Sequence, residues 1–176
     1  MWRKNRRGGY GVDINRNWII GFGGSGSSGV RSSQTYRGTH AISENESTAI
    51  NGYFSKNKNI KGAVDLHQYG QIILRPYGHT TTAPPDEARN AKLGADMQAA
   101  IKSVNGKAYR SMRAIQFWSA AGIASDTFYG THKMLGFTIE MRPPHASFHI
   151  PESEILPNAK ENFEALMVLV RAVSKL

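Results

Sequence analysis

Runs of branched and aromatic residues alternate along this chain with helix-forming segments, and no other feature limits the possible folds as strongly. Three of these runs have the length and composition of β-strands and cover residues 60–67, 71–77 and 135–141. Helices are predicted at residues 43–56, at 84–105 and from about Pro157 onward. Strands that alternate with helices form layered α/β domains, which bind ligands at the ends of the strands.

Short motifs predict where the helices begin and which sides they bury. Ser43 and Glu46 have the spacing of a capping box, in which each side chain bonds a backbone N–H at the helix start. The second helix is expected to begin at Pro84-Pro85-Asp86-Glu87 and to end near Asn105-Gly106. The residues expected along the apolar sides are Ile50, Tyr53 and Phe54, then Ala88, Ala91, Ala95, Ala99 and Ile101, and finally Phe163, Leu166, Val170 and Val173.

The segment 20–33 is rich in Gly and Ser and has two interpretations. Its composition is typical of a flexible linker. Because apolar residues such as Trp18 lead into it and Tyr36 follows it, a long loop packed within one domain is an equally good prediction. The length of 176 residues is that of a single domain.

The absence of cysteine excludes several classes of site. Disulfide frameworks, thiolate zinc sites, iron–sulfur clusters and cysteine nucleophiles all require this residue. No apolar run approaches the roughly 18 residues that a membrane-spanning helix needs. The basic first residues are not followed by an apolar stretch, so no export signal is expected within these residues.

The positive charge is concentrated near the start of the chain. Of the formal net charge of +9, residues 1–37 contribute +6, from seven basic residues and one acid. The basic residues are Arg3, Lys4, Arg6, Arg7, Arg16, Arg31 and Arg37. One interpretation is a basic arm for nucleic acid or an anionic surface. The other is a site for an anionic substrate, built with Arg because the guanidinium fits a carboxylate.

Two polar residues lie where the predicted strands should be apolar. His67 ends one strand and Glu140 ends another, and a lone buried carboxylate costs several kcal/mol unless it is paired or bound to a metal. Both are candidate site residues, although these two residues alone favour a satisfied core His and a Glu that reaches solvent. Residues 11–18 offer an acid, an amide, a guanidinium and an aromatic ring, which suit carboxylate binding or a turn with local hydrogen bonds.

Seven strings occur together, in order, across nearly the whole chain. They are Met-Trp-Arg-Lys-Asn-Arg at 1–6, Gly-Val-Asp-Ile-Asn-Arg-Asn-Trp at 11–18, Ser-Gln-Thr-Tyr-Arg-Gly at 33–38, Ser-Glu-Asn-Glu at 43–46, Asp-Leu-His-Gln-Tyr at 65–69, Pro-Tyr-Gly at 76–78 and Phe-Thr-Ile-Glu-Met-Arg at 137–142. With these strings the chain resembles the zinc metallocarboxypeptidases of the carboxypeptidase A/B type. The resemblance implies a three-layer α/β/α fold with a mixed, mostly parallel sheet. It also implies that residues 1–176 form the C-terminal portion of a single catalytic domain whose N-terminal part is missing.

The resemblance also implies roles for individual residues. His67 matches the last of three protein ligands of one Zn²⁺ ion, and Glu140 matches the general base that takes a proton from the zinc-activated water. Arg3 matches the arginine that stabilises the oxyanion. Asn15 and Arg16 match the pair that binds the free C-terminal carboxylate of the substrate, and Tyr69 matches an aromatic residue of the neighbouring subsites.

The chain departs from the family pattern in three places. The His-x-x-Glu motif that supplies the other two zinc ligands is expected upstream of Arg3, outside this chain. The string from His149 to Glu152 has the right letters, but Pro151 interrupts it and its position excludes it as a substitute. Trp118, or Phe117 if the register shifts by one residue, takes the position of a mobile tyrosine that closes over the substrate. Ser125 takes the position deep in the pocket that selects the C-terminal residue, so small neutral or apolar residues are expected there.

The expected function is that of a metallocarboxypeptidase, a hydrolase that removes the C-terminal residue of peptides or proteins. This chain alone is expected to be inactive, because two ligands are absent. The alternative is a truncated or degenerate non-catalytic relative that keeps a carboxylate-binding pocket. A peptide C-terminus is the expected partner, with no nucleic acid, no membrane and a monomeric state. The resemblance implies that the protein is secreted or lies in a vacuolar-type compartment.

Overall fold

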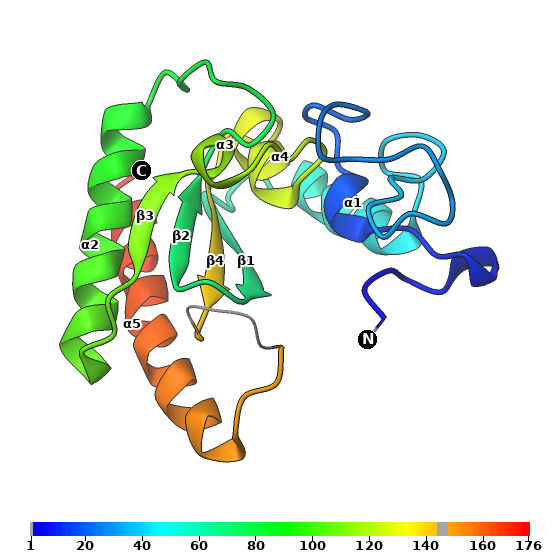
Figure 1. The fold of residues 1–176 in the computed structure, drawn as a ribbon. Helices are drawn as coiled ribbons and strands as arrows, with labels where there is room; N and C mark the ends of the chain where they lie inside the picture. The colour runs from blue at the N-terminus through cyan, green and yellow to red at the C-terminus, as the bar shows by residue number, and fades with distance from the viewer. Residues whose placement is uncertain (1, 144–147) are drawn as a thin grey trace.

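A computed structural model of the chain describes residues 2–143 and 148–176 (Figure 1). Its strands are β1 (Gly62–Gln68), β2 (Ile72–Arg75), β3 (Arg110–Arg113) and β4 (Leu135–Met141). The α-helices are α1 (Asn45–Lys56), α2 (Glu87–Asn105), α3 (Ala114–Phe117), α4 (Ala124–Gly130) and α5 (Ile155–Val173). Three short 3₁₀ helices are η1 (Arg7–Gly9), η2 (Ile14–Arg16) and η3 (Glu152–Glu154).

The four strands form one mixed sheet in the order β1-β4-β2-β3. β1 pairs with β4 in parallel and β2 pairs with β3 in parallel, whereas β2 and β4 are antiparallel. The expected mixed, mostly parallel sheet is therefore confirmed. In the register of β1 and β4, His67 lies opposite Glu140.

Helices cover both faces of the sheet, as predicted. α2 and α5 pack against each other on one face, where Figure 1 shows them side by side. They cover an apolar cluster that includes Ile73, Phe137 and Ile139. On the other face α4 contacts β1 and β4, and Trp18 packs there against Phe128 of α4. Because side chains alternate along a strand, Thr138 and Glu140 of β4 face this second side.

The first helix has the predicted extent but not the predicted cap. The N-cap residue of α1 is Glu44, and its side chain makes no capping bond. The Ser43 hydroxyl instead donates to the Glu44 carboxylate and accepts from Asn17. The capping box is therefore wrong, because Ser43 bonds to Asn17 and Glu44, and Glu46 accepts from Asn5. Of the predicted apolar side, Phe54 packs in a core cluster, whereas Ile50 and Tyr53 are exposed.

The ends of α2 were predicted correctly, but most of its buried side was not. The helix ends at Asn105, and Gly106 follows with the left-handed backbone of a C-cap. Ile101 is buried as expected, together with Leu93 and Met97, while the predicted alanines are half-buried or exposed. Larger apolar side chains gain more from burial than alanine does, so they determine which side of the helix faces the core.

The last helix buries polar residues that its apolar pattern concealed. Phe163 and Val170 are more than half exposed, whereas Glu161 is fully buried. Glu161 accepts hydrogen bonds from Arg142, at 3.0 Å, and from the Tyr109 hydroxyl, at 3.1 Å. A buried carboxylate is stable when it is paired and hydrogen-bonded in this way. The buried side of this helix therefore carries the paired Glu161 as well as Ala165 and Leu169 of the apolar cluster.

The Gly- and Ser-rich segment is a packed loop of the same domain. Ser25 accepts a backbone hydrogen bond from Ala121, and Trp18 and Tyr36 on either side are buried. Gly26 has φ of +77°, and a Cβ atom there would lie 2.1 Å from the Ser119 carbonyl oxygen. Only glycine fits this close approach. The linker interpretation is therefore wrong.

Within the part of the chain that the structure describes, no helix has both the length and the apolar character that crossing a bilayer requires.

Candidate active site

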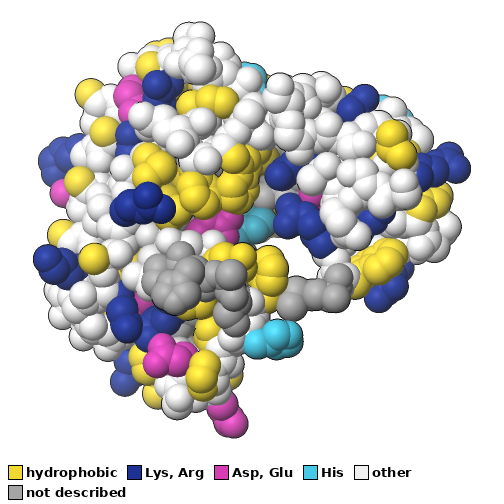
Figure 2. Space-filling view, in the orientation of Figure 1, with side chains coloured by type: hydrophobic (Ala, Val, Ile, Leu, Met, Phe, Trp, Pro, Cys, Tyr) yellow, Lys and Arg dark blue, Asp and Glu magenta, His cyan; other side chains and the backbone are white. Residues whose placement is uncertain are grey.

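The carboxyl ends of β1 and β4 bring His67 and Glu140 together at the base of a hollow. The two residues are register partners on adjacent parallel strands. Figure 2 shows the hollow in the middle of one face of the molecule, with apolar side chains along one wall and basic side chains along the other. Glu140 is only 5% exposed. A carboxylate with so little contact to water is a candidate for chemistry.

Two side chains converge on the outer nitrogen of His67. Asp65 Oδ2 lies 2.7 Å from His67 Nε2, and Asn15 Nδ2 lies 3.0 Å from the same atom. The amide of Asn15 is oriented by its Oδ1, which accepts from the Ala124 N–H at 2.9 Å. One imidazole nitrogen cannot donate to Asp65 and accept from Asn15 at once, so only one contact is a hydrogen bond in a given protonation state.

Burial and neighbouring charges shift the pKa values of both groups. Burial lowers the pKa of His67, but the hydrogen bond to Asp65 and the charges of Asp65 and Glu140 raise it by more, so the net shift is upward. Burial raises the pKa of Glu140, and the nearby cations His67, Arg3 and Arg16 only partly oppose this. A carboxyl group whose pKa is raised toward neutrality is suited to take up and release a proton.

The basic wall is held in place by the segment around η2. Arg16 is 6% exposed, and its Nε donates to the Gly26 carbonyl at 2.8 Å. Burial lowers the pKa of the Arg16 guanidinium, while the charge of Asp13 opposes this shift. Asp13 also accepts from the backbone N–H of Asn15 at 3.1 Å and from Arg3 Nε at 2.9 Å. Arg3 thus lies over the site but turns toward Asp13.

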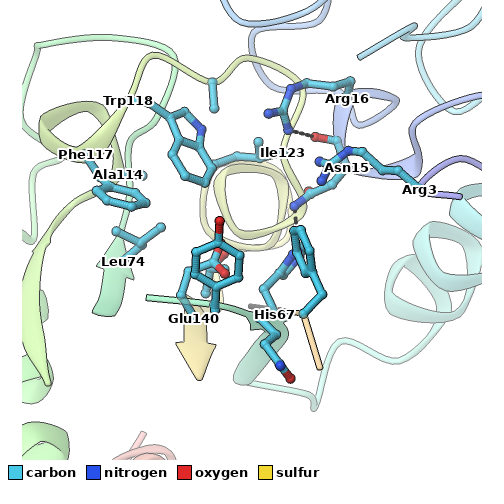
Figure 3. Close-up of a pocket in the computed structure, with 15 residues that line it drawn as sticks. Arg3, Asn15, Arg16, His67, Leu74, Ala114, Phe117, Trp118, Ile123 and Glu140 are labelled. Carbon is cyan, nitrogen blue, oxygen red and sulfur yellow. Dashed lines mark hydrogen bonds between the residues drawn. The ribbon is translucent and has the colours of Figure 1, made fainter. Parts of the chain in front are cut away.

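The opposite wall is apolar and encloses a cavity of about 280 Å³ together with the polar residues. Figure 3 shows Leu74, Ala114, Phe117 and Trp118 on the side of the cavity across from Arg3, Asn15 and Arg16. Trp118 is 43% exposed and packs on Phe117 with ring centroids 4.5 Å apart. Tyr69 also lines the cavity, where its ring meets Phe148 edge to face at 4.9 Å.

The structure brings most of the predicted site residues together. Those that line the cavity are Arg3, Asn15, Arg16, His67, Tyr69, Trp118 and Glu140. Ser125 is not among them: it is fully buried, and its hydroxyl accepts a hydrogen bond from Thr138 at 3.0 Å. Thr138 and Ile123 line the cavity instead, and sequence reasoning missed both. Thr138 could have been found, because it lies two residues before Glu140 on the same face of β4.

His67 is the described residue that could serve as a zinc ligand. The imidazole of His67 is a donor that Zn²⁺ prefers, but a catalytic zinc site uses three protein ligands. Within residues 2–143 and 148–176, no three His, Asp or Glu side chains are grouped closely enough to hold a metal ion. The pair His149 and Glu152 does not form such a group either. His67 therefore fits as one ligand, and a complete site would need donors beyond the described residues.

A second hollow adjoins His67 on the side away from the apolar wall. Its lining includes Asp13, Asp65, Leu66, Phe54 and Ile50. In the part of the chain that the structure describes, β1 pairs with β4 alone, so the other edge of β1 borders this hollow. Leu66 on that strand is 47% exposed. His67 is therefore approachable from a side where the sheet is open.

Known proteins share both the sequence pattern and the fold. A sequence model described as zinc carboxypeptidase matches residues 1–165. Carboxypeptidase A1 of Rattus norvegicus is 36% identical over 177 residues, which cover 97% of this chain and 42% of the relative. Bovine thrombin-activatable fibrinolysis inhibitor, solved in complex with tick carboxypeptidase inhibitor, has a TM-score of 0.89 at 28% identity, covering 94% of this chain and 57% of that chain. Carboxypeptidase A from Helicoverpa armigera has a TM-score of 0.84 at 27% identity, and the match covers 99% of this chain and 46% of that chain. The chain thus spans roughly two-fifths of the length of its curated relative.

Proposed function

Because the chain belongs to the zinc carboxypeptidase family, we propose that it supplies the substrate-binding and proton-transfer residues of an enzyme that hydrolyses the C-terminal peptide bond of peptides or proteins. One observation carries this proposal. Glu140, Arg16 and His67 come from three separate parts of the chain and converge on one cavity that has an apolar wall.

Recognition of the substrate's C-terminus is assigned to Arg16 and Asn15. A guanidinium binds a carboxylate through two parallel hydrogen bonds, and burial strengthens such contacts because little water competes. Arg16 is held by the Gly26 carbonyl and is nearly inaccessible to bulk solvent. The side chain of the terminal residue would then extend toward the apolar wall, and Trp118 and Tyr69 would contact the bound peptide.

The hydrolytic step is assigned to Glu140 and Arg3. When a Zn²⁺ ion is bound, with His67 as one of its ligands, it lowers the pKa of water to near neutrality and polarises a carbonyl group. Glu140 accepts the proton of the attacking water and returns it to the leaving amine. Arg3 is 41% exposed at its side chain and can turn from Asp13 to face the carbonyl oxygen, where negative charge develops. The two other ligands of that ion would come from outside the described residues.

A non-catalytic carboxylate-binding protein is the second candidate. It would keep Asn15 and Arg16 as carboxylate-binding residues of the cavity, and the contacts of His67 Nε2 with Asp65 and Asn15 would then have a structural role alone. Monomeric state and a secreted or vacuolar-type location stay predictions in either case.

A chimera distinguishes the two candidates. The part of rat carboxypeptidase A1 that precedes the matched region would be joined to Met1 of this chain, and the purified protein would be assayed on an N-acylated dipeptide and on its C-terminal amide. If the proposal is right, the chimera hydrolyses the free acid but not the amide, and Glu140→Gln reduces kcat by at least about 100-fold. A folded chimera that binds the free acid and zinc but hydrolyses neither peptide would support the non-catalytic candidate.

A further inference from the structure

We infer that Ile123 sets the size of the C-terminal side chain that the cavity accepts, and that it selects a branched aliphatic side chain over a bicyclic or a basic one. The inference rests on the proposed function, because it takes Arg16 and Asn15 as the residues that bind the substrate carboxylate.

The position of Ile123 relative to the carboxylate-binding pair is fixed by two hydrogen bonds that its neighbours make. Both residues next to Ile123 are tied to the segment that carries Asn15 and Arg16. Trp18 N–H donates to the Gly122 carbonyl at 3.0 Å, and Ala124 N–H donates to Asn15 Oδ1 at 2.9 Å. A substrate held by Asn15 and Arg16 therefore meets Ile123 at a constant depth.

The Ile123 side chain cannot withdraw from the cavity. It is 6% exposed and forms an apolar cluster with Leu74, Ala114 and Ala120. A Cβ atom at Gly78 would lie only 2.8 Å from Ile123 Cδ1, so the side chain already packs against that backbone. Branching at Cβ also restricts its rotamers. A larger ligand must displace packed atoms rather than a flexible chain.

Among the described residues that line the cavity, the acid is Glu140, which the proposed function engages in proton transfer. Figure 3 places Ile123 between the labelled basic residues and the aromatic and aliphatic side chains of the apolar wall. The hydroxyl proton of Thr138 is directed to Ser125, and Ser125 itself has no exposed surface. A lysine or arginine side chain beside Ile123 would lose its water without gaining a counter-ion of its own, because Glu140 is engaged in proton transfer in the proposed function, and such a loss is unfavourable.

Binding of product analogues tests the inference without requiring zinc or hydrolysis. The 176-residue protein would be titrated with N-acetyl-leucine, N-acetyl-tryptophan and N-acetyl-lysine, and dissociation constants would be measured by ¹H–¹⁵N NMR. We expect N-acetyl-leucine to bind about tenfold more tightly than either of the others, a ratio typical of discrimination by an apolar pocket. Ile123→Ala should reduce the preference for N-acetyl-leucine over N-acetyl-tryptophan, measured as the ratio of their affinities, by about fivefold or more. Ile123→Val should reduce it by a smaller factor.

Two further variants make the result specific. Ile73→Ala also truncates an isoleucine to alanine, but on the face of β2 that packs under α2 and α5, outside the cavity. It should leave the leucine-to-tryptophan affinity ratio unchanged within about twofold. Ser125→Ala tests the position that the family resemblance favours. A changed ratio in Ser125→Ala together with an unchanged ratio in Ile123→Ala and Ile123→Val would overturn the inference.

The outcome also separates this inference from the proposed function. If the free acids bind in an Arg16-dependent manner but with equal affinity for all three side chains, the size selection by Ile123 is wrong and the carboxylate site stands. If N-acetyl-leucine and its amide bind equally, the proposed function itself fails.

Discussion

His67 and Glu140 lie directly opposite each other in the register of β1 and β4. The two residues are far apart in the sequence, and the parallel pairing of their strands brings an imidazole and a buried carboxylate to one end of the sheet. Asn15 then connects a third segment to this pair through its contact with His67 Nε2. The candidate site is thus a consequence of the sheet topology, and residues from the N-terminal segment around η2 complete it.

We expect Glu44 to make folding stability depend on pH in the acidic range. Burial raises the pKa of Glu44, but hydrogen bonds from Ser43, Asn5 and Arg7 and the charge of Arg7 lower it by more, so the pKa lies below 4.5. A lowered folded-state pKa gives stability that is present above the unfolded-state pKa and is lost as pH falls through the folded-state value. Glu44→Gln should lower the free energy of unfolding by about 2 kcal/mol at pH 7 and flatten its decrease below pH 4.5.

Urea denaturation at pH values from 7 to about 3 measures this effect. The exposed neighbour Glu46, changed to Gln, is the matched control and should retain the pH dependence of the unaltered chain. Parallel stability profiles of Glu44→Gln and the unaltered chain would contradict the assignment.

Gly26 links the packed loop to Arg16, the residue proposed to bind the substrate carboxylate. Its carbonyl accepts from Arg16 Nε, and a Cβ atom there would lie 2.1 Å from the Ser119 carbonyl oxygen. Gly26→Ala should therefore weaken binding of N-acetyl-leucine as well as lower stability. Gly23→Ala is the control, because Gly23 also has positive φ but its Cβ would have no neighbour closer than 3.8 Å. If the two variants bind the ligand equally well, the loop does not position Arg16.

Met97 tests which side of α2 supports the core. The residue is fully buried between the sheet and α5, and truncation of such a side chain leaves a cavity. Met97→Ala should lower the free energy of unfolding by about 2–4 kcal/mol. Ala99→Ser on the exposed side of the same helix should change it by less than about 0.5 kcal/mol. Comparable losses in the two variants would show that the alanine side is the buried one.

Much of the fold follows from local sequence signals, and the parts that do not follow have a tertiary cause. The ends of α2 and the span of β4 could be predicted, because Gly106 and a run of branched residues mark them locally. The short strand β3, with the sequence Arg-Ser-Met-Arg, carries no such signal and exists because it pairs with β2. The buried polar side of α5 could not be predicted either, since Glu161 owes its burial to Arg142 and Tyr109 on other elements.

The candidate site was predictable to the extent that the family resemblance reached. The resemblance named the residues of the basic wall and the pair His67 and Glu140, and these line one cavity. The resemblance did not identify Ile123. The contribution of this residue depends on the hydrogen bonds that tie Gly122 to Trp18 and Ala124 to Asn15. Residue type alone does not reveal that relationship.

Metal analysis tests whether His67 is part of an incomplete zinc site. After incubation with Zn²⁺ and removal of free metal, the 176-residue protein should retain much less than one equivalent, because a single imidazole with neighbouring acids does not make a stable site. His67→Ala should abolish even the residual binding. Stoichiometric zinc that survives the change at His67 would show that the chain binds metal elsewhere.

The central claim is that this chain binds the free C-terminal carboxylate of a peptide through Arg16. The most direct test is a titration of the 176-residue protein with N-acetyl-leucine and with its amide. It would be carried out on the unaltered chain, on Arg16→Lys and on Arg16→Ala. The account predicts that the acid binds at least about tenfold more tightly than the amide, that Arg16→Lys loses most of this difference, and that Arg16→Ala abolishes it. Equal binding of acid and amide to the unaltered chain, or a preference for the acid that survives Arg16→Ala, would contradict it.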